Sequence, residues 1–131
     1  TYVRDYHSYV RPHLTIKRRW HVMLEPILGS HNAERVLVYI LARDQGYTRG
    51  IARFFGADPD STQKQLVRLE LGGVLVSKSE GRTRLYRFNP RYSFLKELKA
   101  LLNKALLFYP TEEQERLLVV RRRPRRSGKP L

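Results

Sequence analysis

The chain has 131 residues, enough for one compact domain with short extensions and too few for two full domains. Lysine and arginine number 26 against 12 acidic residues, and the net charge of +14 favours polyanionic partners. A hydrophobic share of 41% separates the chain from basic disordered tails, and the absence of cysteine excludes disulfides, thiolate zinc sites and cysteine nucleophiles. No apolar run approaches the roughly 18 residues that suggest a membrane span, and residues 1–14 have no signal-peptide core, so a cytoplasmic location is expected.

The amino-terminal part divides into an arm and a helix. Residues 1–14 are aromatic and polar without a regular period, and we expect them to form an irregular arm. From Thr15 onward apolar residues return at helical spacing, which predicts a helix that is kinked at Pro26 and ends at Gly29. Its apolar positions are Trp20, Met23, Leu24, Ile27 and Leu28.

A longer helix follows, over about residues 33–41. Its apolar residues repeat at intervals of three and four, which is the spacing of one helix face. Ser30 or Asn32 is expected to cap its start, and Gly46 is expected to be the left-handed residue that ends it.

Two more helices follow in close succession. The first is short, with Thr48 as its expected N-cap and Gly56 as its stop. The second opens with Asp58 and Pro59, an N-cap and first-turn pair, and it ends at Gly72 and Gly73. The buried positions expected in these two helices are Ile51, Ala52, Phe55, Thr62, Leu66 and Leu69.

Two β-rich runs come next, over residues 74–78 and 83–88, and the glycine in residues 79–82 between them predicts a hairpin. Asn89 and Pro90 then open a helix with an apolar seam that lasts to Pro110. A short helical piece around residues 112–120 precedes a basic tail over 121–131.

The order helix, short helix, turn, helix, hairpin is that of a winged helix-turn-helix domain. Residues 51–56, 58–70 and 73–76, followed by the run Glu-Gly-Arg-Thr-Arg-Leu-Tyr-Arg-Phe-Asn-Pro at 80–90, resemble the ArsR-like winged-helix transcription regulators. The resemblance covers approximately residues 24–107. It implies a mainly α fold with a small β-hairpin, a winged helix-turn-helix domain with amino- and carboxyl-terminal helical extensions. The predicted divisions are an arm at 1–14, the domain with its first helix at 15–90, carboxyl-terminal helices at 91–120 and the tail.

If the helix that opens with Asp58 and Pro59 buries Thr62, Leu66 and Leu69, its opposite side faces the major groove. Glutamine can pair bidentately with adenine, lysine can reach guanine or a phosphate, serine can contact a base edge or the backbone, and valine can touch a thymine methyl. The predicted base-reading residues are Ser61, Gln63, Lys64 and Val67. Basic residues on the short helix and on the wing are predicted to neutralise phosphates: Arg49, Arg53, Lys78, Arg82 and Arg84.

The apolar seam of the helix after Pro90 has two interpretations, a dimer interface or packing against its own domain. We favour the dimer, because the face holds more apolar residues than a small domain readily covers. The predicted interface residues are Phe94, Leu98, Leu101, Leu102, Ala105 and Tyr109.

The basic tail contains five arginines and one lysine among eleven residues, dense enough to suggest an anionic or protein partner, although a solvated end is the alternative. Its predicted partner-binding residues are Arg121, Arg122, Arg123, Arg125, Arg126 and Lys129. The wing and tail together resemble regulators encoded beside nucleotidyltransferase-type toxins. That resemblance implies an antitoxin that neutralises its toxin and regulates its own operon.

The four histidines, at positions 7, 13, 21 and 31, form no i, i+4 pair on one helix, so we expect no metal site. No phosphate loop, nucleophile elbow or close carboxylate pair is present, and we expect neither catalysis nor a cofactor. Three functions follow from the sequence: a homodimeric, sequence-specific DNA-binding repressor, which we favour; the antitoxin; and nonspecific nucleic-acid binding through charge alone.

Overall fold

The computed structural model describes residues 21–122, which form six helices and one two-stranded antiparallel sheet. The helices are α2 (Glu25–Leu28), α3 (His31–Arg43), α4 (Thr48–Phe55), α5 (Pro59–Leu71), α6 (Leu95–Leu106) and α7 (Thr111–Arg122), and the strands are β1 (Leu75–Glu80) and β2 (Thr83–Phe88). The predicted class, mainly helical with a small hairpin, is confirmed for this part of the chain. The predicted arm at 1–14 lies outside the described residues.

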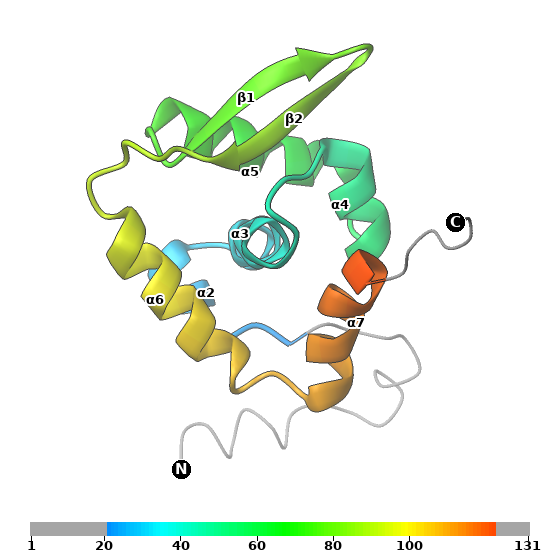
Figure 1. Cartoon of the computed structure of the whole chain (residues 1–131), viewed down its shortest axis with the longest axis vertical. Helices are drawn as coiled ribbons and strands as arrows, with labels where there is room; N and C mark the ends of the chain where they lie inside the picture. Colours follow the sequence, from blue (N-terminus) through cyan, green and yellow to red (C-terminus); the bar gives the residue numbers. More distant parts are fainter. Residues whose placement is uncertain (1–20, 123–131) are drawn as a thin grey trace.

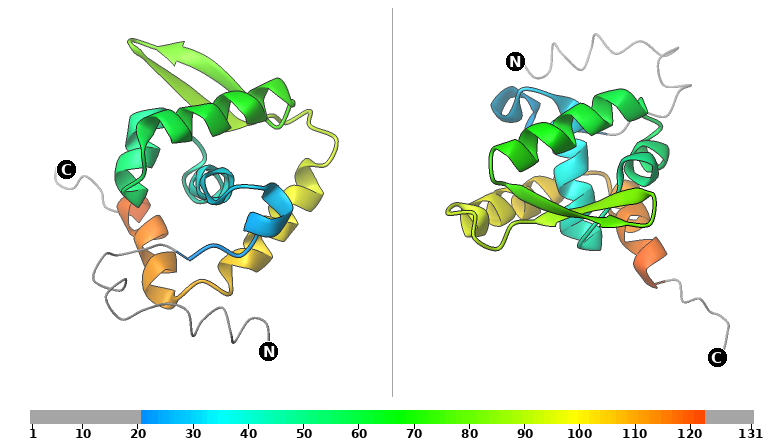
Figure 2. Two further views of the ribbon diagram at one scale, coloured as in Figure 1. Left: turned by 180° about the vertical axis from the view of Figure 1, so that it is seen from behind. Right: turned by 90° about the horizontal axis from the view of Figure 1, so that it is seen from above.

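Helix α3 lies at the centre, and the other elements surround it (Figures 1 and 2). Ser30 caps its start, because the Ser30 hydroxyl oxygen accepts the backbone N–H groups of Asn32 at 3.0 Å and Ala33 at 3.2 Å. The helix buries side chains all around its circumference, including Val36, Leu37 and Ile40. Each such burial is worth about 1.5–3 kcal/mol relative to exposure, so α3 is the main source of the core.

The residue that ends α3 is not the predicted one. Asp44 takes the left-handed conformation, with φ of 74°, two residues before Gly46. Gly46 instead exchanges two backbone hydrogen bonds with Tyr86 of β2, at 3.0 and 2.8 Å. A Cβ atom at position 46 would lie 2.9 Å from the Tyr39 ring, so the close approach to that ring requires glycine here.

Helices α4 and α5 are joined by a turn of three residues, in which Gly56 has φ of 67°. The prediction for the start of α4 was wrong, since Tyr47 is at the N-cap position and Thr48 is the first helical residue. At the start of α5 the prediction is confirmed, because Asp58 Oδ2 accepts the Ser61 N–H at 2.9 Å and Pro59 follows the cap. Ile51, Ala52, Phe55, Thr62, Leu66 and Leu69 are all buried, as predicted.

The hairpin is longer and tighter than predicted. Strand β1 runs from Leu75 to Glu80, and Glu80 pairs directly with Thr83, which leaves only Gly81 and Arg82 in the turn. Gly81 has φ of 61°, and glycine is favoured at the first central position of a two-residue hairpin turn of type II′. The hairpin lies alongside α5 (Figure 2).

The first predicted helix is mostly absent from the described residues. Only Glu25–Leu28 is helical, and residues 21–24 are not, because the N–H groups of Met23 and Leu24 donate to the carboxylate of Glu34 instead of joining a helix. Residues 15–20 of that prediction lie outside the described part.

The carboxyl-terminal helices share the core with the rest. The core cluster that contains Leu37 and Leu66 also contains Leu102, Ala105, Tyr109 and Leu117. Helix α6 begins at Leu95, later than predicted, because residues 90–94 form turns at 90–91 and 93–94 and the Asn89 amide donates to the Gly73 carbonyl at 2.9 Å. Helix α7 extends to Arg122, so two residues of the predicted basic tail are helical.

Candidate nucleic-acid interface

Helix α5 separates a buried face from an exposed one. Thr62 and Leu66 point into the core, and Gln63, Lys64 and Val67 lie on the opposite, exposed side. Val67 keeps 39% of its surface accessible, which is unusual for a valine on a helix in contact with α3 and α4. An exposed row that mixes an amide, an ammonium and an apolar side chain has the hydrogen-bonding and apolar groups that base edges require.

Ser61 is placed differently from the other predicted reading residues. It is half-buried, and its hydroxyl donates to Asp58 Oδ2 at 3.0 Å, beside the capping bond from its own N–H. Its side chain therefore serves the first turn of α5, and a base contact in which Ser61 donates would require this hydrogen bond to break.

Gln63 connects three elements. The Thr48 hydroxyl of α4 donates to Gln63 Oε1, and Gln63 Nε2 donates to the Tyr86 hydroxyl of β2 at 3.5 Å. Bidentate pairing with adenine would use the remaining hydrogen-bonding position of both amide atoms, so Gln63 can pair only in the orientation in which these two partners hold it. Lys64 and Val67 have no such ties among the described residues, so they are the better candidates for direct reading.

Two of the predicted phosphate contacts lie on α4. Arg49 and Arg53 are exposed and line a shallow hollow with Ala57 and Pro59, at the turn into α5. Within the described residues neither guanidinium has an acidic partner. The two positive charges therefore lie next to the start of α5 and remain available to an anion.

The three predicted contacts on the hairpin are divided between its faces. Arg84 shares the face of Tyr86 and donates to the hydroxyls of Ser77 at 3.0 Å and Ser79 at 3.3 Å. Ser77 in turn donates to Glu70 Oε2 of α5 at 2.7 Å, so this side of the hairpin is tied to α5.

The opposite face and the turn are less constrained. Lys78 is on the opposite face, with its Nζ 3.5 Å from Glu80 Oε2. Both groups are exposed, and such a surface pair is readily exchanged for another anion. Arg82 projects from the turn and has no partner among the described residues.

Sequence reasoning missed two basic residues near these positions. Arg87 is exposed on the same hairpin face as Lys78, and Arg68 is exposed on the last turn of α5. The alternation within residues 83–88 contains the signal for Arg87, because a buried Tyr86 requires residues 85 and 87 to face the other way. Arg68 is separated by four positions from Lys64, which places it on the same side of α5.

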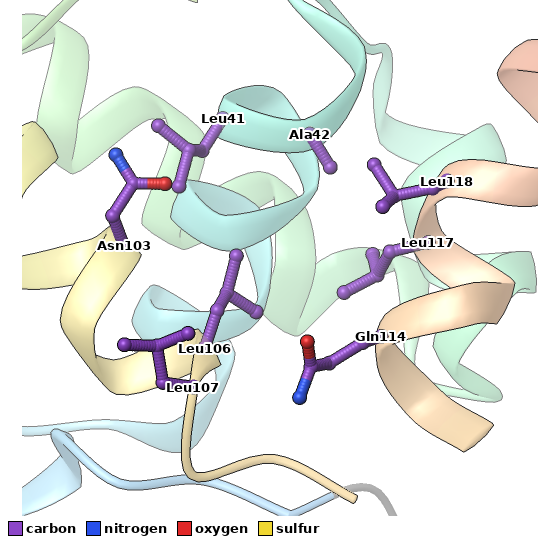
Figure 3. A pocket seen from close by; sticks show the side chains of 8 residues that line it. All are labelled: Leu41, Ala42, Asn103, Leu106, Leu107, Gln114, Leu117 and Leu118. Atoms are coloured by element: carbon purple, nitrogen blue, oxygen red, sulfur yellow. The ribbon is translucent and has the colours of Figure 1, made fainter. Parts of the chain in front are cut away.

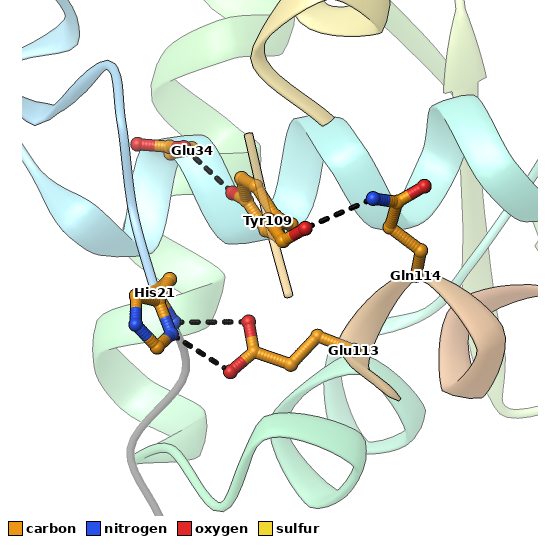
Figure 4. Close-up of polar contacts among 5 residues, drawn as sticks. All are labelled: His21, Glu34, Tyr109, Glu113 and Gln114. Carbon is orange, nitrogen blue, oxygen red and sulfur yellow. Dashed lines mark hydrogen bonds and ion pairs between the residues drawn. The ribbon is translucent and has the colours of Figure 1, made fainter. Parts of the chain in front are cut away.

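A buried polar cluster at the other end of the molecule was also missed (Figure 4). The Glu34 carboxylate is fully buried and accepts the N–H groups of Met23 and Leu24, each at 2.7 Å, and the Tyr109 hydroxyl at 2.6 Å. Burial, together with the hydrogen bond to this carboxylate, raises the pKa of Tyr109 well above its usual range. Glu113 accepts the backbone N–H of His21 at 3.2 Å and lies 2.9 Å from its Nδ1. The cluster joins the segment before α2 to α3 and α7.

The residues predicted to form the dimer interface are partly buried in the core and partly exposed. Leu102, Ala105 and Tyr109 are buried within the chain, so these three are wrong as interface residues and follow the alternative, packing against their own domain. Their side chains face α3, which buries them. Leu98 is half-buried, and Phe94 and Leu101 remain exposed.

An apolar hollow opens beside this helix, where α3, α6 and α7 meet (Figure 3). Its lining is Leu41, Ala42, Asn103, Leu106, Leu107, Gln114, Leu117 and Leu118. Leu107 at its rim is 74% exposed, so the molecule presents an apolar surface on the side of α6 and α7.

Of the predicted tail residues, Arg121 and Arg122 belong to α7, while Arg123, Arg125, Arg126 and Lys129 lie outside the described residues. Among residues 21–122, no group of three or more histidine or acidic side chains could hold a metal ion. The described helices are all too short or too polar to cross a membrane. Comparison of the chain with protein-family profiles, curated proteins and solved structures gives no match.

Proposed function

We propose that this chain is a winged helix-turn-helix protein that binds double-stranded DNA and regulates transcription, without enzymatic activity. Helix α5 would enter the major groove, and the β1–β2 hairpin would be the wing on the flanking backbone. The observation that supports this most is the exposed row on α5, Lys64 and Val67 above all. This helix packs against α4 and β1, and both α4 and the hairpin carry exposed basic residues.

The arrangement of the elements agrees with this proposal. The central helix α3 is followed by a β-bridge at Gly46, by α4 and α5 with a short turn between them, and by the hairpin. The bridge joins Gly46 to Tyr86, so the segment before α4 lies beside β2. Helix α5 packs against both α3 and α4, and β1 packs against α5. The exposed row is therefore supported from behind by the core, as a helix that presents side chains to a groove needs to be.

Charge supplies the affinity in this proposal. Arg49 and Arg53 on α4, and Arg82 in the turn of the hairpin, are exposed basic groups that could each neutralise a phosphate. Such contacts fix the position of the protein on the duplex, while Lys64 and Val67 would distinguish base pairs.

We further infer that the protein acts as a two-fold dimer, so that two copies of α5 reach major grooves about 34 Å apart. The interface differs from the predicted one, because only exposed apolar side chains can contribute to it. On and around α6 these are Phe94, Leu101, Leu107 and Phe108. Sedimentation equilibrium over a range of concentrations tests the dimer.

A selection from a randomised duplex library, followed by salt-titrated binding of the enriched and the scrambled duplex, tests the function. We expect a preference of about 10³ or more for the enriched duplex. The variant Lys64→Ala/Val67→Ala is expected to lose about tenfold or more of this preference, since each base contact is worth about 1–3 kcal/mol. Lys99→Ala on α6 removes the same charge away from α5, at a side chain that lies over Phe88 of its own chain, and should leave the preference unchanged. Equal binding to every duplex, unaffected by the double variant, would contradict the proposal in favour of binding through charge alone.

A further inference from the structure

The exposed amide of Gln63 on α5 is held by two hydroxyl groups that come from two other elements. The Thr48 hydroxyl of α4 donates to Gln63 Oε1, and Gln63 Nε2 donates to the Tyr86 hydroxyl of β2 at 3.5 Å. Because the Gln63 amide is exposed, water could satisfy it as well, and the two hydrogen bonds add little to the stability of the fold. Their main consequence is that a long side chain with many rotamers is fixed at the surface.

Both hydroxyl groups are placed by secondary structure, independently of Gln63. Tyr86 is 2% exposed, so its ring is packed in the core and its hydroxyl has a defined position. Gly46 exchanges backbone hydrogen bonds with Tyr86 at 3.0 and 2.8 Å, and Thr48 follows Gly46 by two residues as the first residue of α4. The bridge therefore couples the start of α4 to β2, and α4 in turn packs against α5.

The two hydrogen bonds leave a definite set of free positions on the amide. A glutamine side chain has two donors on its nitrogen and two acceptor positions on its oxygen. The Thr48 hydroxyl occupies one acceptor position and the Tyr86 hydroxyl occupies one donor, so one of each remains. The count would be the same if the amide were turned over, because each hydroxyl can either donate or accept.

Among the four bases, adenine matches one free donor and one free acceptor. In the major groove adenine presents its N7 acceptor and its N6 donor, whereas guanine presents two acceptors, N7 and O6. An unconstrained glutamine could turn both of its donors to guanine, but the second donor of Gln63 is already bound to Tyr86. Thymine and cytosine each present a single hydrogen-bonding group. The free positions of Gln63 are therefore complementary to adenine and disfavour guanine.

We propose that Gln63 reads an adenine in the major groove and that Thr48 and Tyr86 are positioning residues, which hold the Gln63 amide ready for that base. The inference rests on the proposed function, in which the exposed side of α5 enters the groove. It adds a third base contact to those of Lys64 and Val67 and assigns that contact a base. An amide that is fixed before binding loses less conformational entropy when it pairs.

The base pair that Gln63 contacts has to be found first. The enriched duplex is varied one base pair at a time, and binding of the unmodified chain and of Gln63→Ala is compared at each position. We expect one position in a half-site to carry adenine, and its preference over guanine to fall by about tenfold or more in Gln63→Ala. Replacing that adenine with 7-deaza-adenine, which lacks the N7 acceptor, should weaken binding of the unmodified chain and leave Gln63→Ala unaffected.

Variants of the two hydroxyl residues then test the positioning. Thr48→Val and Tyr86→Phe each remove one hydroxyl and nearly keep the shape, so the preference for adenine over guanine at that position should fall by about fivefold in each. Thr48→Ser keeps the hydroxyl and should retain the preference. Thr111→Val, the same substitution at the first residue of α7, is the matched control and should leave every preference unchanged. A loss of stability alone would lower binding to all duplexes equally, so it would not move this ratio.

The inference is overturned if Gln63→Ala alters no base preference, or if the position that it alters carries a base other than adenine. It is also overturned if either Thr48→Val or Tyr86→Phe leaves the preference for adenine unchanged. Each of these results leaves the proposed function standing, because the unmodified chain would still prefer the enriched duplex. If the unmodified chain preferred no duplex, the proposed function itself would fail and this inference with it.

Discussion

The two ends of this protein use the same kinds of side chain in opposite ways. At the end near α2 and α7, Glu34 and Glu113 are buried, and each accepts two or more hydrogen bonds. At the end formed by α4, α5 and the hairpin, Arg49, Lys64 and Arg82 are exposed and have no partner among the described residues. The buried carboxylates hold segments of the fold together, whereas the exposed cations make no hydrogen bond or ion pair within the described residues.

This difference indicates where to look for function in a small basic domain. A buried carboxylate is retained only when its hydrogen bonds are satisfied inside, so it reports on structure. An exposed cation costs the fold little and can be replaced without loss of stability, so a concentration of such cations around one helix reports on a ligand. Variants at the two ends should therefore separate stability from binding.

The largest effect should come from Glu34→Ala. The substitution leaves the N–H groups of Met23 and Leu24 and the Tyr109 hydroxyl without their acceptor in a buried site. Each stranded donor costs about 1–3 kcal/mol, so we expect the free energy of unfolding in urea to fall by about 4 kcal/mol.

Glu25→Ala is the matched control, because this carboxylate is half exposed on α2 and should change the free energy by less than about 0.5 kcal/mol. Equal effects of the two substitutions would mean that the buried cluster does not hold the segment before α2 in place.

The next largest effect should come from Leu102→Ala, which tests whether the buried side of α6 belongs to the domain core. Leu102 is fully buried within one chain, so its truncation should cost about 2–5 kcal/mol at any protein concentration. Its neighbour Leu101 is 37% exposed, and Leu101→Ala should cost less than about 1 kcal/mol at concentrations where the chain is monomeric. If Leu102 lay in a dimer interface instead, the midpoint of thermal unfolding of the two proteins would converge on dilution.

The buried side of α6 also shows how much of the packing can be predicted from the sequence. The helical period of residues 90–109 identified the apolar positions, and all of Leu102, Ala105 and Tyr109 are indeed buried. The period does not reveal whether the covering surface is the chain's own core or a second copy, because both are apolar. The Tyr109 hydroxyl donates to Glu34, which is 75 residues away in sequence, and no local sequence pattern predicts a hydrogen bond at that separation.

Local chemistry was predictable where the residue and its partner are close in sequence. The Asp58 cap, the glycine at 56 and the buried stripe of α5 all follow from positions within four residues of one another. The prediction that Gly46 ends α3 was wrong for the opposite reason, since Gly46 pairs with Tyr86, forty residues later in the sequence. For the candidate interface, the exposed row of α5 could be predicted, whereas the ties of Gln63 to Thr48 and Tyr86 depend on the packing of three elements.

The smallest effect on stability, and the clearest on binding, should come from Arg82→Gln. The Arg82 side chain projects from the hairpin turn without a partner among the described residues, so the free energy of unfolding should change by less than about 0.5 kcal/mol. If the hairpin contacts a phosphate there, the magnitude of the salt slope of DNA binding should fall by about 0.9. Arg84→Gln is the informative comparison, because the Arg84 guanidinium donates to Ser77 and Ser79. Its loss should lower the stability by about 1 kcal/mol as well as weaken binding. A stability loss at Arg82 equal to that at Arg84 would contradict the division between partnered and exposed cations on which the interface is argued.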